Sequence, residues 1–149
     1  MLIRSIFNTP WGNIEVEHDE HFLYSSLFTQ KSVTPAANHL AQQIDAELKS
    51  YLSDPHHRFQ LSLKPQGSTY QQKVWNALLV IPVGRTLTYG ELALKLQSSP
   101  RAIGQACKKN PLTLFIPCHR VIGKNSLGGY MGNVNALAYK EALLHHESF

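Results

Sequence analysis

The residues best suited to chemistry lie around Cys118, one of only two cysteines, which stands between Pro117 and His119. A lone cysteine is most often a small buried hydrophobe, and such a residue needs neither of these neighbours. Here His119 can relay a proton, and Arg120 adds positive charge that favours a thiolate over a thiol. Adjacent residues on a strand point to opposite faces, so either the backbone bends at Cys118 or a water bridges the two side chains. The segment predicts thiol chemistry.

The loop that follows this segment is rich in glycine. Gly123, Gly128, Gly129 and Gly132 surround Tyr130, and a backbone of this kind can close over a flat ligand with its amide groups exposed. A purely structural glycine-rich hairpin fits the same composition equally well. Spacing and composition alone therefore predict a thiol site next to a glycine-rich loop and leave the substrate open.

Two short helices are expected just before the cysteine, over residues 89–96 and 100–109. Thr88 and Ser99 are suitable N-caps, and Pro100 fits the first helical position. A tight turn between two short helices suggests a helix-turn-helix, although many helical hairpins are only structural. The second helix carries cations and small residues, as expected of a helix that approaches nucleic acid closely; these are Arg101, Lys108 and Lys109, with Ala102, Gly104 and Ala106.

The remaining elements predict an α+β fold. Alternating apolar residues indicate antiparallel strands over 2–7, 14–18 and 22–28 and a further strand over 59–63. Thr34 and Pro35 read as the start of a helix that Asp54 and Pro55 end, and Ser68 can cap another. A final helix is expected over 135–147. The turn at residues 64–67 divides the chain into an N-terminal α/β domain, 1–66, and a mostly helical C-terminal domain, 67–149.

Composition narrows the class of protein. The 149 residues are 43% hydrophobic and 16% charged, as in an ordinary globular protein, and we expect a cytoplasmic location and no membrane segment. Two cysteines fit a reducing compartment. The scattered histidines lack the short spacing of metal ligands, so we expect no metal. Residues 1–70 carry five Lys and Arg against seven Asp and Glu, whereas residues 71–149 carry nine against three. An anionic partner is therefore expected on the second half.

The segment Pro117–Val121 resembles the active-site signature of the O6-alkylguanine-DNA alkyltransferases, also called methylated-DNA-protein-cysteine methyltransferases. The resemblance extends over most of residues 70–149, through motifs that occur in the same order: Val74–Trp75, Ile81–Gly84, Thr88–Ala93, Arg101–Gly104, Asn110–Pro111, Gly129–Tyr130 and Lys140–Leu144. It implies a ribonuclease H-like layout for the N-terminal sheet and helix. It also implies DNA repair by a suicide enzyme that needs no cofactor and moves the alkyl group of O6-alkylguanine, and of O4-alkylthymine, to a cysteine.

The resemblance assigns catalytic roles to four residues. Cys118 is the nucleophile, activated by a water held by His119, while Glu147 stabilises the imidazolium that forms. Tyr89 donates to the base and helps to rotate the target nucleotide. The expected partner is double-stranded DNA with an alkylated guanine, bound by a monomer through the minor groove with the target base flipped out.

The remaining implied residues bind DNA or line the substrate pocket. Arg101 enters the base stack, and Ala102, Gly104 and Lys108 lie at the groove. Asn110 braces the link between the second helix and the cysteine segment, and Thr113 stands where mammalian members carry a proline. Tyr130, the backbone of Met131, and the carbonyls of Cys118 and Val121 surround the guanine.

The chain departs from the usual family pattern at two places. It is about two residues shorter between Tyr89 and Arg101, and about three residues longer within 133–135. Two alternatives also stay open. A lesion-binding module without chemistry carries tryptophan in place of the cysteine, so Cys118 argues against it. A cysteine hydrolase would cycle, whereas an alkyltransferase stops after one event.

Overall fold

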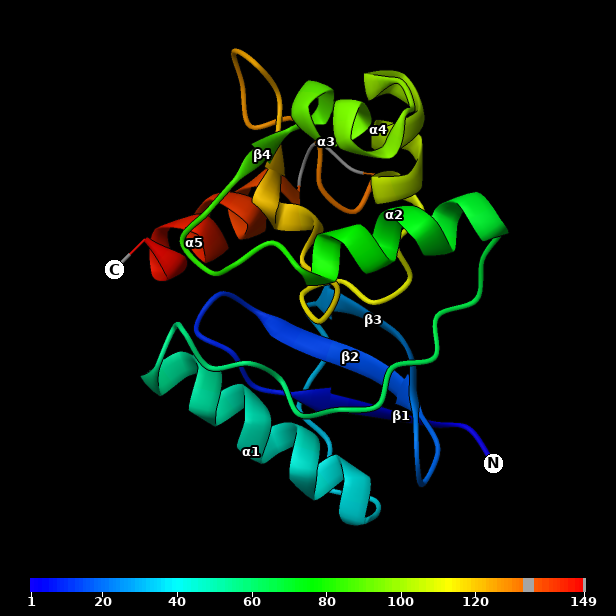
Figure 1. The fold of residues 1–149 in the computed structure, drawn as a ribbon. Coiled ribbons are helices and arrows are strands. Elements are labelled where there is room, and N and C mark those ends of the chain that lie inside the picture. The colour runs from blue at the N-terminus through cyan, green and yellow to red at the C-terminus, as the bar shows by residue number, and fades with distance from the viewer. Residues whose placement is uncertain (133–135, 149) are drawn as a thin grey trace. The chain divides into compact units, whose positions relative to one another are not determined.

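The computed structural model describes residues 1–132 and 136–148. The chain forms two compact units, which are described separately. The first unit comprises Met1–Gln66 with Pro111–Phe115, and the second comprises Gly67–Asn110 with Ile116–Phe149 (Figure 1). The first unit therefore takes in a five-residue segment that the sequence division assigned to the second half of the chain.

The first unit is built on a three-stranded antiparallel sheet in the order β1-β2-β3, which confirms the predicted sheet; its strands are β1 (Ile3–Phe7), β2 (Asn13–His18) and β3 (Leu23–Thr29). In β2 the alternate residues Ile14, Val16 and His18 are buried, as the period-2 pattern requires. Helix α1 (His39–Ser53) lies beside this sheet in Figure 1 and buries Leu40, Ala41, Ile44, Leu48 and Tyr51. The ribonuclease H-like layout stays a prediction.

Helix α1 begins later than the sequence predicted. Asn38 is its N-cap and accepts a hydrogen bond from the Ala41 amide. The predicted cap, Thr34, instead pairs with strand β1, because its hydroxyl accepts from the Ile6 amide and its own amide donates to the Ile6 carbonyl. Thr34 has the residue type of a helix cap. It instead makes two hydrogen bonds to the edge of the sheet, and these depend on tertiary structure that local sequence does not reveal.

Two segments add to strand β3 without forming strands of their own. The expected strand over 59–63 is wrong in extent: only Leu63 makes a bridge, to Leu23. Pro111–Phe115 lies against Ser26, whose amide donates to the Pro111 carbonyl and whose hydroxyl donates to the Thr113 carbonyl at 2.7 Å. These bonds explain why the segment belongs to the first unit.

The second unit contains four α-helices among its described residues: α2 (Thr69–Leu79), α3 (Tyr89–Leu96), α4 (Pro100–Lys108) and α5 (Leu137–Glu147). The predicted N-caps Ser68, Thr88 and Ser99 are confirmed, and the first two form full capping boxes. Trp75 ties α2 to α4, because its indole N–H donates to the Ala106 carbonyl at 2.9 Å. The expected start of the last helix, Asn135, lies outside the described residues.

A short parallel sheet joins the two parts of the second unit that carry the reactive side chains. Strand β4 (Leu87–Thr88) pairs with β5 (Val121–Ile122), with Leu87 opposite Val121 and Thr88 opposite Ile122. Helix α3 begins directly after β4. A 3-10 turn, Cys118–Arg120, comes directly before β5. Cys118 and His119 therefore do not lie on a strand, and of the two possibilities left open by the sequence, the backbone does bend here.

Within the ranges that the structure describes, no helix has both the length and the apolar character needed to cross a membrane.

Candidate active site and DNA-binding face

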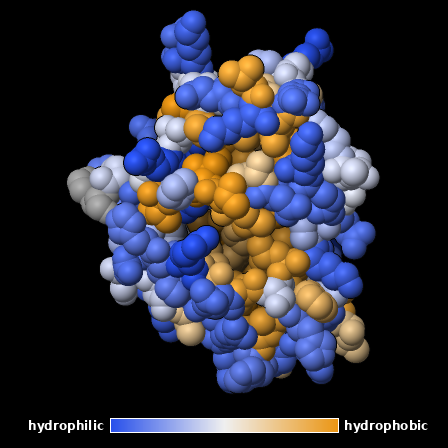
Figure 2. Space-filling view, in the orientation of Figure 1, coloured by the Kyte–Doolittle hydropathy of each residue, from blue (hydrophilic) through white to orange (hydrophobic). Residues whose placement is uncertain are grey.

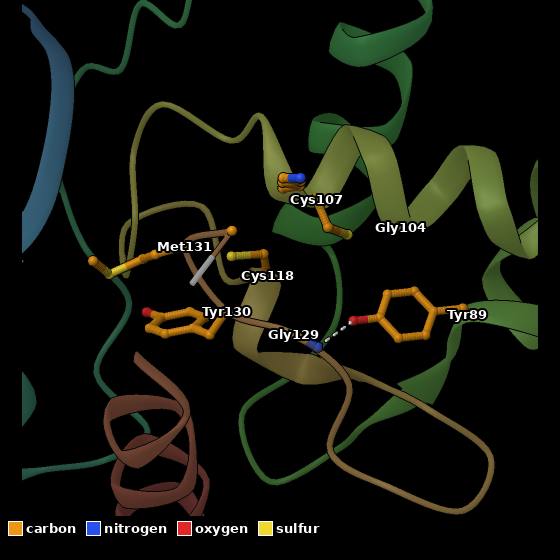
Figure 3. Close-up of a pocket in the computed structure, with 9 residues that line it drawn as sticks. Tyr89, Gly104, Cys107, Cys118, Gly129, Tyr130 and Met131 are labelled. Atoms are coloured by element: carbon orange, nitrogen blue, oxygen red, sulfur yellow. Dashed lines mark hydrogen bonds between the residues drawn. The ribbon is translucent and has the colours of Figure 1, made fainter. Parts of the chain in front are cut away.

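A cavity of about 280 Å³ lies in the second unit, close to the lower end of the range of roughly 300–1,000 Å³ that is usual for small-molecule sites. Cys118 and Cys107 both face it, and Tyr89 approaches from the side of α3 (Figure 3). Among the described residues, the lining comes from α3, α4, the 3-10 turn and the glycine-rich loop: Tyr89, Gly104, Cys107, Lys108, Cys118, Gly129, Tyr130, Met131 and Gly132. The structure thus brings together the candidates Cys118, Tyr89, Gly104, Lys108, Tyr130 and Met131.

Cys118 is a free thiol with 6% of its surface exposed. Burial raises the pKa of this thiol, while a hydrogen bond from the Asn110 side chain and the charge of Lys140 act in the opposite direction. Asn110 also donates to the Ile116 carbonyl at 2.9 Å, so its amide spans the turn that carries the cysteine. The thiol is therefore the resting form, and it needs a base before it can attack.

His119 is placed to accept that proton. It is fully buried, and its Nε2 lies 2.7 Å from Oε2 of Glu147. Its other ring nitrogen, Nδ1, has no hydrogen-bond partner among the described residues. Burial lowers the pKa of His119 below its ordinary value of 6.5, with the Glu147 hydrogen bond acting in the opposite direction, so the imidazole is neutral at pH 7. A neutral imidazole with a carboxylate behind it is suited to general base chemistry.

Arg120 stabilises the carboxylate behind His119. Its Nε and Nη2 donate to the two oxygens of Glu147 at 2.8 and 3.0 Å, and its Nη1 donates to the Ile81 carbonyl at 2.7 Å. Burial opposes ionisation of Glu147, but the hydrogen bonds from His119 and Arg120 outweigh it and hold the pKa of this carboxyl well below its ordinary 4.5. Arg120 therefore pairs with Glu147, and the expectation that its charge acts on Cys118 directly is wrong.

Tyr89 is held against the glycine-rich loop. The Gly129 amide donates to the Tyr89 hydroxyl oxygen at 3.3 Å, shown as the dashed line in Figure 3. Because the oxygen accepts this bond, the hydroxyl hydrogen remains free to be donated. Burial raises the pKa of Tyr89, so the phenol stays protonated near neutral pH. The side chain is thus a proton donor at the edge of the cavity.

One face of α4 carries two cations, with open space above the glycine that lies between them. Arg101, Gly104 and Lys108 recur at helical spacing, the two cations are exposed, and a Cβ added at Gly104 would meet nothing within 4 Å. Ala102 is half-buried beside them. Figure 2 shows hydrophilic residues interspersed with hydrophobic ones over the part of the molecule where α3 and α4 lie. Such a face suits the close approach of a polyanion.

Two candidate pocket residues are placed differently from the rest. Thr113 is buried in the first unit, where its carbonyl accepts from Ser26. Val121 is buried beside the cysteine turn, and its carbonyl, expected to accept from guanine, already accepts from Lys140 Nζ at 2.6 Å. A carbonyl oxygen has two lone pairs, so Val121 retains capacity for a second donor.

Sequence reasoning missed two residues of the site. Cys107 lines the cavity from α4, and Lys140, within α5, is fully buried. A signal for Lys140 was present: it stands three residues after Leu137 and three before Leu143, on the apolar face of its helix. A lysine at such a position seldom lies in a core without a specific role.

No cluster of three or more His, Cys, Asp or Glu side chains that could hold a metal ion occurs in the portion of the chain that the structure covers. The arrangement of thiol, base, carboxylate and phenol is self-contained as an acid-base and nucleophile set.

The chain is similar to proteins of known family. A family model described as the 6-O-methylguanine DNA methyltransferase, DNA binding domain matches residues 69–149. A methylated-DNA–protein-cysteine methyltransferase of Methanosarcina acetivorans is 35% identical over 152 residues, which covers 96% of each chain. The constitutive enzyme of that name from Bacillus subtilis is 40% identical over 126 residues, covering 76% of this chain and 74% of its own.

Solved structures agree with the sequence matches. The O6-methylguanine methyltransferase of Mycobacterium tuberculosis has a TM-score of 0.84 at 30% identity, with 99% of this chain and 93% of that one covered. A structure from the same organism in complex with DNA has a TM-score of 0.81 at 30% identity, covering 97% and 92%. The resemblance drawn from Pro117–Val121 is confirmed, and the chain belongs to the methylated-DNA–protein-cysteine methyltransferase family.

Proposed function

We propose that this protein repairs DNA by moving the alkyl group from O6 of guanine, and from O4 of thymine, to Cys118 in a single irreversible event. The observation that carries the proposal is the buried thiol of Cys118 at the cavity, beside His119 and its 2.7 Å bond to Glu147. The neutral, buried imidazole supplies a base, and the family to which the chain belongs supplies the substrate class.

The proposed reaction begins with loss of the Cys118 proton. Through a bridging water this proton passes to Nδ1 of His119, the ring nitrogen that faces away from Glu147. The imidazolium is stabilised by the Glu147 carboxylate, which Arg120 keeps ionised. Sγ then attacks the alkyl carbon, an S–C bond forms, and the bond from that carbon to O6 breaks.

The departing guanine needs a proton, because the broken bond leaves its electron pair on the base. Tyr89 can donate one, since its hydroxyl oxygen is held by Gly129 while its hydrogen remains free. The thioether that remains on Cys118 is stable, so each molecule acts once and needs no cofactor. This single use distinguishes the proposed reaction from hydrolysis.

For DNA binding we propose that α3 and α4 act as a helix-turn-helix in the minor groove of a bound duplex, with the target nucleotide flipped into the cavity. Arg101, at the start of α4, would fill the space that the flipped nucleotide leaves in the base stack. Gln97, in a left-handed conformation with φ 53°, makes the short turn between the helices possible. We place the protein in the cytoplasm as a monomer, where both free cysteines stay reduced.

The proposal is tested by intact-mass spectrometry after mixing the protein with a duplex that contains one O6-methylguanine. We expect a gain of one methyl group that saturates at one per protein, and no gain with the unmodified duplex. Tight binding of the modified duplex without a gain in mass would identify a lesion sensor instead. Release of more than one methyl per protein would identify a cycling hydrolase.

The pH dependence of methyl transfer should reflect the low pKa of His119. The base form of a group is populated above its pKa, and burial keeps this pKa below 6.5. The single-turnover rate should therefore hold as pH falls through 6.5 and decline only at lower pH. Rates measured between pH 5 and 7.5 check this, after excluding pH values at which the fold is lost. Half-loss of the rate at pH 6.5 or above would contradict it.

Gly104→Ala should increase the stability of the protein and decrease its affinity for DNA. Alanine in a helix interior is favoured over glycine by about 0.5–1 kcal/mol, and nothing in the protein obstructs the new methyl group. We expect a higher free energy of unfolding in urea and, because the methyl group stands on the proposed groove face, a roughly tenfold weaker Kd for duplex DNA, which corresponds to about 1.4 kcal/mol.

Gln105→Ala is the matched control for this variant, since it changes an exposed neighbour on the same helix. Unchanged DNA affinity in Gly104→Ala would mean that this part of α4 does not approach the duplex closely.

A further inference from the structure

Lys140 is a charged residue in the interior of the second unit that the proposed reaction does not use. Its side chain is fully buried, and burying an ammonium group is costly unless its donors are satisfied. Nζ donates to the Val121 carbonyl at 2.6 Å and to the Gly129 carbonyl at 3.0 Å. It also lies 5.8 Å from the centroid of the Tyr89 ring, within the range of a cation–π contact.

These two carbonyls belong to different segments of the second unit. Val121 directly follows the turn that carries Cys118, whereas Gly129 belongs to the glycine-rich loop. The Gly129 amide in turn donates to Tyr89, so Gly129 links the buried ammonium, through its carbonyl, to the phenol, through its amide. Lys140 thus connects the cysteine segment, the loop and the phenol through hydrogen bonds of no more than 3.3 Å.

One residue of the loop, Met131, has an unfavourable backbone conformation, in a region that glycine tolerates. Gly128, Met131 and Gly132 all have positive φ, of 79°, 54° and 64°. A left-handed conformation is unfavourable for Met131 and persists only where surrounding contacts enforce it. The hydrogen bond from Lys140 to the Gly129 carbonyl, two residues before Met131, is a contact that fixes this loop.

We propose that Lys140 is a positioning residue, which fixes the loop Gly128–Gly132 and the Tyr89 hydroxyl relative to Cys118. The inference rests on the proposed function, since it assigns the geometry of that same site. It predicts that Lys140 controls the rate of alkyl transfer and leaves DNA affinity, which depends on the exposed face of α4, largely unchanged.

The test compares Lys140→Met, Tyr89→Phe and the double variant in single-turnover methyl transfer from a saturating O6-methylguanine duplex. Methionine keeps the length of the side chain and removes its donors. We expect Lys140→Met to slow transfer by about 10- to 100-fold, the usual range for lost hydrogen bonds to a charged group, with Kd for the duplex within about twofold. Uptake should still end at one methyl per protein.

The double variant distinguishes positioning from general destabilisation. If Lys140 acts through Tyr89, the double variant should be no more than about threefold slower than Tyr89→Phe, because coupled residues are not additive. Fully multiplicative losses would overturn the proposal. Lys140→Gln, which retains an amide donor, should recover part of the rate. Lys49 is an exposed lysine of the first unit, and Lys49→Met should match the unmodified protein.

A second readout does not depend on the chemistry. Amide hydrogen exchange over residues 128–132 should be at least about tenfold faster in Lys140→Met or, if that variant does not fold, in Lys140→Gln. Unchanged exchange in a folded variant would overturn the proposal even if the unmodified protein takes up no methyl group. Failure of the proposed function is seen separately, as absence of mass gain in the unmodified protein.

Discussion

Cys118→Ser is expected to take up no methyl group from an O6-methylguanine duplex, whereas Cys107→Ser is expected to take up one per protein. The two variants make the same change in two buried thiols that line the same cavity. A serine hydroxyl is a far weaker nucleophile than a cysteine sulfur, so removal of the reactive thiol should stop the transfer altogether.

The surroundings of the two thiols explain the expected contrast. Burial raises the pKa of Cys107 to about 12, with the charge of Cys118 adding to the effect. Cys118 is also buried, but it receives a hydrogen bond from Asn110 and is followed directly by His119. Only Cys118 therefore has both a stabilising donor and an adjacent base.

Intact mass with peptide mapping measures this contrast. Both variants should bind the modified duplex with similar Kd, since neither changes the exposed face of α4. Methyl groups found on Cys107 in Cys118→Ser, or no methyl uptake by a folded Cys107→Ser, would refute the assignment of the nucleophile.

Gly128→Ala should slow methyl transfer by more than about 100-fold, while Gly129→Ala should change it by less than about threefold. A Cβ at Gly128 would lie 2.5 Å from the Tyr89 hydroxyl oxygen and 2.7 Å from its Cε2, far inside van der Waals contact. Gly128 also has a φ of 79°, where alanine is strained. The substitution must therefore displace the phenol or the loop, and loss of aligned proton donation alone costs roughly 10²–10⁴ in rate.

Gly129→Ala is the matched control for Gly128→Ala, because it is the next residue and makes the same chemical change. A Cβ at Gly129 would meet nothing within 4 Å, and alanine keeps the amide that donates to Tyr89. Single-turnover rates, with Tm to show that both variants fold, decide the outcome. Equal losses in the two variants would mean that the loop tolerates no side chain at all, and that contact with Tyr89 is not the cause.

Local signals predicted much of the second unit. Ser68, Thr88 and Ser99 cap their helices because the capping hydrogen bonds join residues only three apart, so no tertiary contact can override them easily. The antiparallel sheet of the first unit followed in the same way from alternation along the chain. The start of α1 did not, because Thr34 found a partner in a strand 28 residues away.

The site was predictable to the extent that a motif specified it. Cys118, Tyr89 and Tyr130 line one cavity, as the family resemblance implied. The orientation of Arg120 was not predictable, because its partners, Ile81 and Glu147, lie 39 and 27 positions away and only the folded chain brings them near. The burial of Lys140 had a signal in the sequence, but its partners did not, because backbone carbonyls carry no side-chain signature.

The four-residue ladder of β4 and β5 sets the spacing between two parts of the site. Its register fixes how far Tyr89, directly after β4, stands from the turn that carries Cys118, directly before β5. One residue of strand advances the chain by about 3.3 Å, more than a hydrogen bond can absorb. Insertions between Thr88 and Tyr89, or between Cys118 and Val121, would therefore change the distance between the proposed acid, Tyr89, and the proposed nucleophile, Cys118. Length changes at the exposed Arg85 and Thr86 would leave this spacing intact.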